Sequence, residues 1–154
     1  MGFTKDHRLH HVKPHGALYN AAAKDLALAR AICEGVAQVD DQLPLYGLAG
    51  SQLLEAAREV GLPAYSEVFA DRGYQADGSL VPRSQPKAVL TDPLAVAERA
   101  LSMVQTQSVT AVTGETVPLK VDTICVHGDN QAALALVDQL RQTFTANGIT
   151  IQAC

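Results

Sequence analysis

The chain has 154 residues, with 47% apolar and 18% charged residues and a formal net charge of −4 at pH 7. This composition is typical of a globular protein and excludes an intrinsically disordered chain. The sequence contains no basic stripe and no apolar run of the roughly 20 residues that span a bilayer, so we expect neither nucleic acid nor a membrane as a partner.

Residues 1–11 are polar and contain no apolar signal region, which predicts a cytoplasmic protein. Cys33, Cys125 and Cys154 are far apart in the sequence and form no C-x-x-C pair. We therefore predict reduced thiols, without a disulfide framework or a zinc ribbon. Cys125, inside an apolar segment, is interpreted as a core residue.

Strand and helix patterns alternate in the first half of the chain. Residues 8–12, which end just before Lys13 and Pro14, are a short strand candidate, and the apolar runs at 44–48 and 64–70 predict two further strands. Helical spacing predicts one helix over residues 21–39 with Asn20 as its N-cap, and a second that Gly50 and Ser51 open and Gly61 ends. Residues 71–86 are long, polar and rich in Gly and Pro, which favours a functional loop.

The second half continues the alternation. A helix starts at Asp92 with Pro at its first position and runs to about residue 105, and residues 109–120 predict a hairpin that turns near Gly114. Residues 121–126 are almost continuously apolar, which predicts a strand buried on both faces. Asn130 caps a further helix that ends near Gly148, and residues 149–152 predict a last short strand.

This order indicates an α/β fold with a mainly parallel sheet in a single domain over residues 1–154. Polar clusters follow the strands, and ligands bind at the carboxyl ends of parallel strands. The four clusters are expected to share one rim and comprise residues 13–20, residues 47–51, Glu67 with residues 71–74, and residues 127–130.

Each polar residue has a structural and a chemical interpretation. His15 is either a loop histidine or a general acid–base group, and Lys13 is either a solvated charge or a stabiliser of an oxyanion. His127 and Asp129 form either a turn with a helix cap or an acid–base or metal-ligating group. Glu67 either faces solvent or is buried with a partner, since an unpaired buried carboxylate is costly.

The remaining polar residues also have more than one interpretation. Asp71 and Arg72 can form a weak local ion pair, while Arg83 is either an exposed loop charge or a fork for a substrate carboxylate. Residues 47–51 lack the Gly-Lys-Ser/Thr end of a P-loop, so they predict a tight strand-to-helix turn instead of a phosphate cradle.

Four blocks taken together closely resemble the LamB/YcsF family of 5-oxoprolinase A subunits. They are VKPHGALYN at residues 12–20, EVFADR at 67–72, DGSLVPR at 77–83 and VHGD at 126–129, and the similarity extends from about Leu9 to the C-terminal strand. The resemblance implies an incomplete (β/α) barrel of the polysaccharide-deacetylase-like type.

The resemblance also implies an activity, namely ATP-coupled hydrolysis of 5-oxo-L-proline to L-glutamate in a complex with subunits B and C. ATP would be a co-substrate, and the need for a metal stays open. By motif, the implied catalytic residues are Lys13, His15, Glu67, His127 and Asp129. The implied substrate-binding residues are Asp71, Arg72 and Arg83.

The family's N-terminal blocks, which are rich in Asn, Asp and His, do not occur here. We therefore expect the chain to correspond to the C-terminal part of a longer barrel, with an exposed sheet edge that favours self-association. Two alternatives to the lactam hydrolase are a metal-dependent carbohydrate deacetylase and a binding remnant without catalysis.

Overall fold

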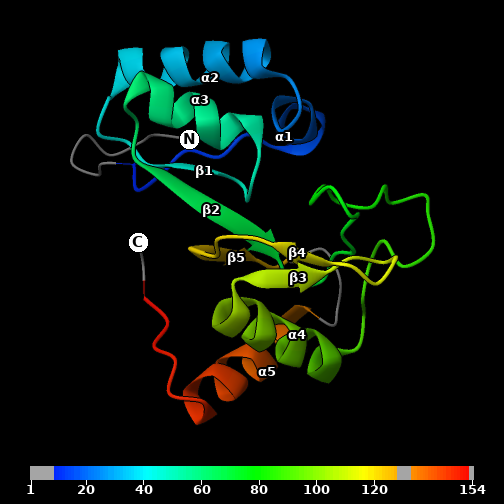
Figure 1. Cartoon of the computed structure of the whole chain (residues 1–154). Helices are drawn as coiled ribbons and strands as arrows, with labels where there is room; N and C mark the ends of the chain where they lie inside the picture. Colours follow the sequence, from blue (N-terminus) through cyan, green and yellow to red (C-terminus); the bar gives the residue numbers. More distant parts are fainter. Residues whose placement is uncertain (1–8, 128–132, 153–154) are drawn as a thin grey trace. The chain divides into compact units, whose positions relative to one another are not determined.

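Strands and helices alternate in the computed structural model, which describes residues 9–127 and 133–152 (Figure 1). Strands β1, β2 and β5 form one sheet in the order β1-β2-β5, and β2 pairs with β5 in parallel. The predicted α/β class with a mainly parallel sheet is therefore confirmed. The elements are α1 (Gly16–Ala22), α2 (Leu26–Val39), β1 (Leu45–Leu48), α3 (Gln52–Val60), β2 (Ala64–Phe69), α4 (Pro93–Thr106), β3 (Ser108–Thr110), β4 (Thr116–Pro118), β5 (Thr123–Cys125) and α5 (Ala133–Ala146).

The chain divides into two compact units, residues 1–66 and residues 67–154, with the boundary inside β2. A single domain over residues 1–154 stays a prediction.

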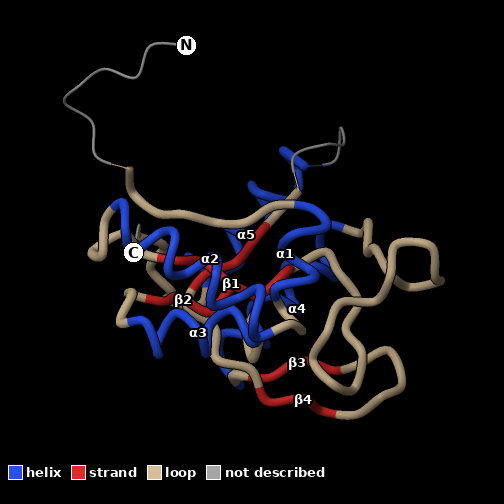
Figure 2. Tube along the Cα trace, turned by 90° about the horizontal axis from the view of Figure 1, so that it is seen from above, coloured by secondary structure: helices blue, strands red, loops and turns tan. Residues whose placement is uncertain are grey.

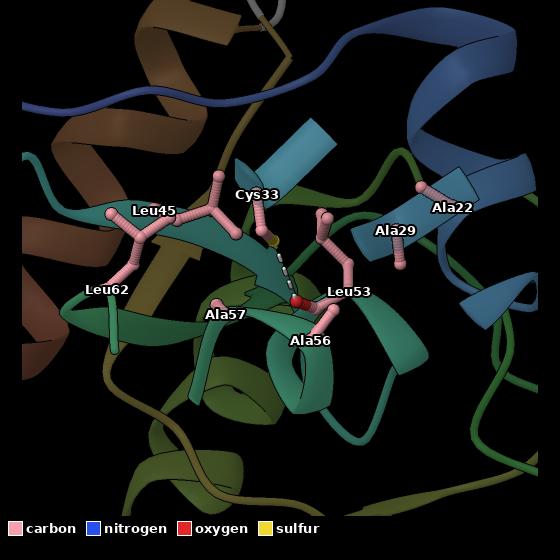
Figure 3. Close-up of a cluster of buried hydrophobic side chains, with 8 residues drawn as sticks. All are labelled: Ala22, Ala29, Cys33, Leu45, Leu53, Ala56, Ala57 and Leu62. Atoms are coloured by element: carbon pink, nitrogen blue, oxygen red, sulfur yellow. Dashed lines mark hydrogen bonds between the residues drawn. The ribbon is translucent and has the colours of Figure 1, made fainter. Parts of the chain in front are cut away.

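The core of the first unit lies between α2 and α3, and Figure 3 shows the side chains that fill it. Cys33 is completely buried there, and its Sγ lies 3.7 Å from the carbonyl oxygen of Leu53, to which it donates. Burial raises the pKa of the Cys33 thiol to about 11, because the thiolate would lose its hydration. This thiol is therefore a packing group and not a nucleophile. The buried members of the cluster are Ala22, Ala29, Cys33, Leu45, Leu53, Ala56, Ala57 and Leu62.

The start of the first unit differs from the prediction in two respects. Asp25, not Asn20, caps the long helix, since its Oδ1 accepts from the backbone N–H groups of Ala27 at 2.9 Å and Leu28 at 3.1 Å. Asn20 lies inside the separate short helix α1, where its side-chain amide donates to the carbonyl of Gly16 at 3.0 Å. The strand predicted over residues 8–12 is wrong: of the described part of this segment, only Val12 makes a parallel bridge, to Leu45.

Helices α4 and α5 pack together in the second unit, and β3 and β4 run side by side as the predicted hairpin (Figure 2). Asp92 caps α4 and Gly61 ends α3 in the left-handed conformation, as predicted. Strand β5 is shorter than predicted and only half-buried, so both its burial on two faces and the core placement of Cys125 are corrected. Residues 149–152 form no strand, and the predicted cap Asn130 lies outside the described residues.

The loop between β2 and α4 has its own internal order. Two antiparallel bridges, Arg72 with Val89 and Tyr74 with Leu80, fold it back on itself. Gly73 lies at its tightest point, where a Cβ atom would come within 2.3 Å of the carbonyl oxygen of Lys87. Only a residue without a side chain fits there, so this glycine is required by close backbone approach.

We predict that Gly73→Ala lowers the free energy of unfolding by about 1–3 kcal/mol, because the new methyl group forces the two loop segments apart. Gly35→Ala is the matched control. Gly35 lies inside α2 with open space around its missing Cβ, so this change stabilises the chain by about 0.5–1 kcal/mol. Urea unfolding of the two variants measures both effects, and equal midpoints for Gly73→Ala and the unchanged chain would contradict the close approach.

Candidate functional site

The site in the second unit is built around a contact between Asp71 and His127. Asp71 lies two residues beyond the end of β2, and His127 lies two residues beyond the end of the neighbouring β5. The Nδ1 atom of His127 is 3.1 Å from Oδ1 and 2.9 Å from Oδ2 of the carboxylate. An ionised carboxylate only accepts hydrogen bonds, so Nδ1 donates its proton to Asp71. The other ring nitrogen, Nε2, is then free of the proton in the neutral imidazole and can act as a base.

The aromatic ring of Phe69 fixes a second side of His127. The two ring centroids are 5.6 Å apart, with 21° between the planes, and the imidazole retains 25% exposure against 6% for the Asp71 side chain. Phe69 is the last residue of β2 and is in register with Cys125, the last residue of β5. The parallel pairing therefore sets both contacts to the imidazole.

Two further residues belong to the site. Tyr74 lay in the predicted cluster of residues 71–74 without a role of its own, and Arg99 was not singled out by the sequence pattern. The completely buried Tyr74 hydroxyl accepts from the backbone N–H of Phe69 at 2.8 Å. Arg99 of α4 donates to the carbonyl of Ala70 at 3.0 Å and lies 5.5 Å from the centre of the Tyr74 ring. Burial raises the pKa of Tyr74 and lowers that of Arg99, and the nearby Tyr74 and Asp71 oppose the change at Arg99.

One signal for Arg99 was present in the sequence. It follows Val96 by three residues and precedes Met103 by four, and both of these are buried on the inner side of α4. A charged residue at that spacing falls on the buried face of the helix, where it needs an acceptor. Tyr74 carried no comparable signal, because a loop residue has no periodicity to indicate burial.

Arg72 is buried, and its guanidinium binds two backbone carbonyls of the loop. Its Nε donates to the carbonyl of Ala88 at 2.9 Å and its Nη2 to the carbonyl of Val81 at 2.7 Å. Burial lowers the pKa of Arg72, and the positive charge of Arg83 lowers it further. The observed bonds thus hold the loop segments around residues 81 and 88 close to Arg72. The predicted substrate contact of Arg72 stays a prediction.

Arg83 is exposed on the same loop. No carboxylate pairs with its guanidinium in the part of the chain that the structure describes. Its charge is close enough to lower the pKa of Arg72. An exposed guanidinium of this kind suits an incoming anion such as a carboxylate.

Glu67 is buried in β2 at 3% exposure, which removes the alternative that it faces solvent. It is in register with Thr123, and its charge contributes to the raised pKa of Tyr74. Asp129 lies outside the described residues, so its predicted catalytic role stays a prediction. Asp71, predicted to bind substrate, is the group that contacts the imidazole.

The first unit holds the other predicted residues. The Nζ atom of Lys13 lies 5.5 Å from the ring centre of Tyr19, which is buried. His15 is exposed at the N-cap position of α1, where its side chain makes no capping bond. The parallel bridge between Val12 and Leu45 places this segment beside β1.

The segment at residues 47–51 forms the predicted strand-to-helix turn. Gly50 adopts a positive φ of 76°, and the first helical N–H, of Gln52, donates to the carbonyl of Ala23 at 3.0 Å. The Ser51 hydroxyl is buried without a hydrogen bond among the described residues. Since the chain itself occupies this helix start, the turn is interpreted as structural.

The predicted rim is observed in part. The clusters that follow β2 and β5 meet in the second unit, whereas a single rim of four clusters stays a prediction. Among residues 9–127 and 133–152, no three His, Cys, Asp or Glu side chains come together in a way that could hold a metal ion. The same residues include no helix with the length and apolar character needed to cross a membrane.

Comparison with known proteins adds to this geometry. The chain is 99% identical over 154 residues to the 5-oxoprolinase A subunit of Limosilactobacillus fermentum, covering all of this chain and 62% of that protein. It is 58% identical over 146 residues to the 5-oxoprolinase A subunit of Bordetella parapertussis, covering 95% of this chain and 58% of the relative. The chain thus spans about three fifths of the length of these curated relatives.

A crystal structure shows the same fold. The lactam utilization protein from Thermus thermophilus matches with a TM-score of 0.87 at 41% identity, covering 96% of this chain and 58% of that one. The sequence of residues 2–154 matches the LamB/YcsF family. The chain therefore belongs to the LamB/YcsF family.

Proposed function

We propose that this chain is the part of a 5-oxoprolinase A subunit that carries an acid–base histidine, and that it acts with subunits B and C in ATP-coupled hydrolysis of 5-oxo-L-proline. The observation that carries the proposal is the Asp71–His127 contact at the ends of two paired parallel strands. The names of the relatives support the reaction, and the contact supports the role of the imidazole.

The chemistry explains why ATP is needed. A five-membered lactam is a poor electrophile, and transfer of the γ-phosphoryl group to its amide oxygen makes the carbon more reactive. Water then adds to that carbon, the C–N bond breaks, and the nitrogen takes up a proton. A second water hydrolyses the resulting acyl phosphate to the carboxylate of glutamate and inorganic phosphate.

His127 would transfer protons in these steps. With Nδ1 held by Asp71, Nε2 takes a proton from the attacking water and returns it to the leaving nitrogen. The Asp71 carboxylate stabilises the imidazolium that exists between the two transfers, as the buried aspartate of a Ser-His-Asp triad does.

The other groups would bind and polarise the substrate. Arg83, exposed and without an acidic partner among the described residues, would hold the 5-oxoproline carboxylate. Lys13 would stabilise negative charge on the activated amide, and His15 would act as a second proton carrier. Glu67 would position water. These four roles stay proposals.

One prediction concerns the tautomer of His127. Because Asp71 accepts from Nδ1, neutral His127 carries its proton on Nδ1, whereas the exposed His15 favours the ordinary Nε2–H form. Long-range ¹H–¹⁵N NMR spectra of the imidazole rings distinguish the two forms. An Nε2–H form at His127 would contradict the hydrogen bond to Asp71.

A second prediction concerns turnover. In a complete A subunit that contains this sequence, combined with subunits B and C, His127→Gln and Asp71→Asn should lower kcat for glutamate release about 10²- to 10⁴-fold. Both variants should stay folded, since each preserves the size of the side chain. His10→Gln, which changes an exposed histidine of the first unit, is the control and should keep full activity. Unchanged turnover in His127→Gln would remove the proposed role.

A third prediction concerns recognition of the carboxylate. Arg83→Ala should raise KM for 5-oxoproline about tenfold or more, because a charge-assisted contact is lost, and should leave KM for ATP unchanged. Arg141→Ala, an exposed arginine on α5, is the matched control. An equal KM in the two variants would show that another group holds the carboxylate.

A further inference from the structure

The side chains of Tyr74 and Arg99 bind the backbone just before Asp71. The Tyr74 hydroxyl accepts from the N–H of Phe69, and Arg99 donates to the carbonyl of Ala70, the residue just before Asp71. The last backbone bond of the sheet at this point, from Ala70 N–H to the carbonyl of Cys125, is long at 3.4 Å. Tyr74 and Arg99 therefore add to the bonds that hold the end of β2, where the backbone N–H of Leu90 also donates to the carbonyl of Asp71 at 2.8 Å.

Both groups are costly at their positions. Tyr74 is completely buried, where a phenylalanine would fill the same space without a hydroxyl that needs a partner. Arg99 is half-buried on the inner side of α4, and no carboxylate lies within ion-pair distance of it among the described residues. Burying a charge without an ion pair is unfavourable, and a Leu or Met would pack on this face at lower cost.

The two residues also support each other. The Arg99 guanidinium lies 5.5 Å from the centre of the Tyr74 ring, in cation–π range. Each polar end points to one backbone group of the same strand end, one to an N–H and one to a carbonyl. Tyr74 binds the N–H of residue 69 and Arg99 binds the carbonyl of residue 70. The pair thus anchors the backbone immediately before residue 71.

We propose that Tyr74 and Arg99 are positioning residues for the Asp71–His127 contact. The inference rests on the proposed function of His127 and extends it to residues that need not touch substrate. Phe69 stacks on the imidazole and Asp71 binds its Nδ1, so both contacts originate from the segment that Tyr74 and Arg99 hold. A small displacement of this segment moves the imidazole relative to the substrate, and proton transfer is sensitive to such displacements.

The experiment compares Arg99→Gln, Arg99→Lys and Tyr74→Phe in the complete A subunit that contains this sequence. Turnover is measured with subunits B and C, and the ¹⁵N spectrum of the His127 ring is measured on the isolated A subunit. We expect kcat to fall about 10- to 100-fold in Arg99→Gln and Tyr74→Phe, with KM within about twofold, and the Nδ1–H signal of His127 to shift or weaken. Arg99→Lys keeps a donor for Ala70 and should recover part of both losses.

Two matched controls separate positioning from general stability. Arg141→Gln alters an exposed arginine of the same unit, and Tyr65→Phe removes a hydroxyl from β2 away from its carboxyl end. Neither should change kcat or the His127 spectrum. An unchanged His127 spectrum in Arg99→Gln and Tyr74→Phe would overturn the inference, even if these variants unfold at a lower temperature, because only a structural contribution would then remain.

The spectrum also separates this inference from the proposed function. If His127→Gln keeps full turnover while Arg99→Gln still perturbs the His127 ring, the proposed function fails and the positioning role stands. If His127→Gln abolishes turnover and Arg99→Gln leaves both kcat and the ring unchanged, the positioning role fails and the proposed function stands.

Discussion

The parallel pairing of β2 with β5 is the constraint on which the candidate site depends. Glu67, Val68 and Phe69 lie in register with Thr123, Ile124 and Cys125, so the two strands end at the same level. Residues 71 and 127 are far apart in the sequence and become neighbours only through this register. A shift by one residue would turn the side chains of one strand to the opposite face and separate the carboxylate from the imidazole.

The loop that follows β2 is organised by buried polar groups. Arg72 binds two loop carbonyls, Tyr74 and Arg99 bind the strand end, and Gly73 allows two backbone segments to approach. Buried backbone groups need a partner, which can be backbone, a side chain or ordered water. Here side chains from the loop and from α4 bind several of them, which gives the segment next to Asp71 a defined conformation.

Local signals in the sequence predicted much of the fold. Gly61, the Asp92–Pro93 pair and the turn at Gly114 mark element boundaries that the structure confirms, because each depends on backbone preferences of a few residues. Asn and Asp are equally favoured at a helix N-cap. Asp25 is the cap here because the helical structure is interrupted between α1 and α2, so that α2 begins at Leu26. The segments at 8–12 and 149–152 were predicted as strands, but among their described residues only Val12 forms a β-bridge.

For the site, the sequence indicated which residues carry chemistry but not which of them meet. Asp71 and His127 were both candidates, yet the contact between them depends on strand register, which the sequence pattern does not specify. Tyr74 lay in a predicted cluster and Arg99 had its helical spacing as a signal, but their role is to bind main-chain groups, which residue identity does not indicate. The resemblance to a family indicated Arg72 and Arg83 as candidate residues of the loop, whereas the structure shows which carbonyls Arg72 binds.

The two bonds of Arg72 have a consequence for how this loop can change over evolutionary time. They tie down residues 81 and 88 and leave the segment from 82 to 86, with Arg83 at its exposed side, as a tip outside the tied region. Insertions and substitutions are tolerated best at such exposed tips. Arg83, proposed above to hold the substrate carboxylate, can therefore be exchanged while the imidazole and its carboxylate keep their places, so residues at this tip and the Asp71–His127 contact can diversify separately.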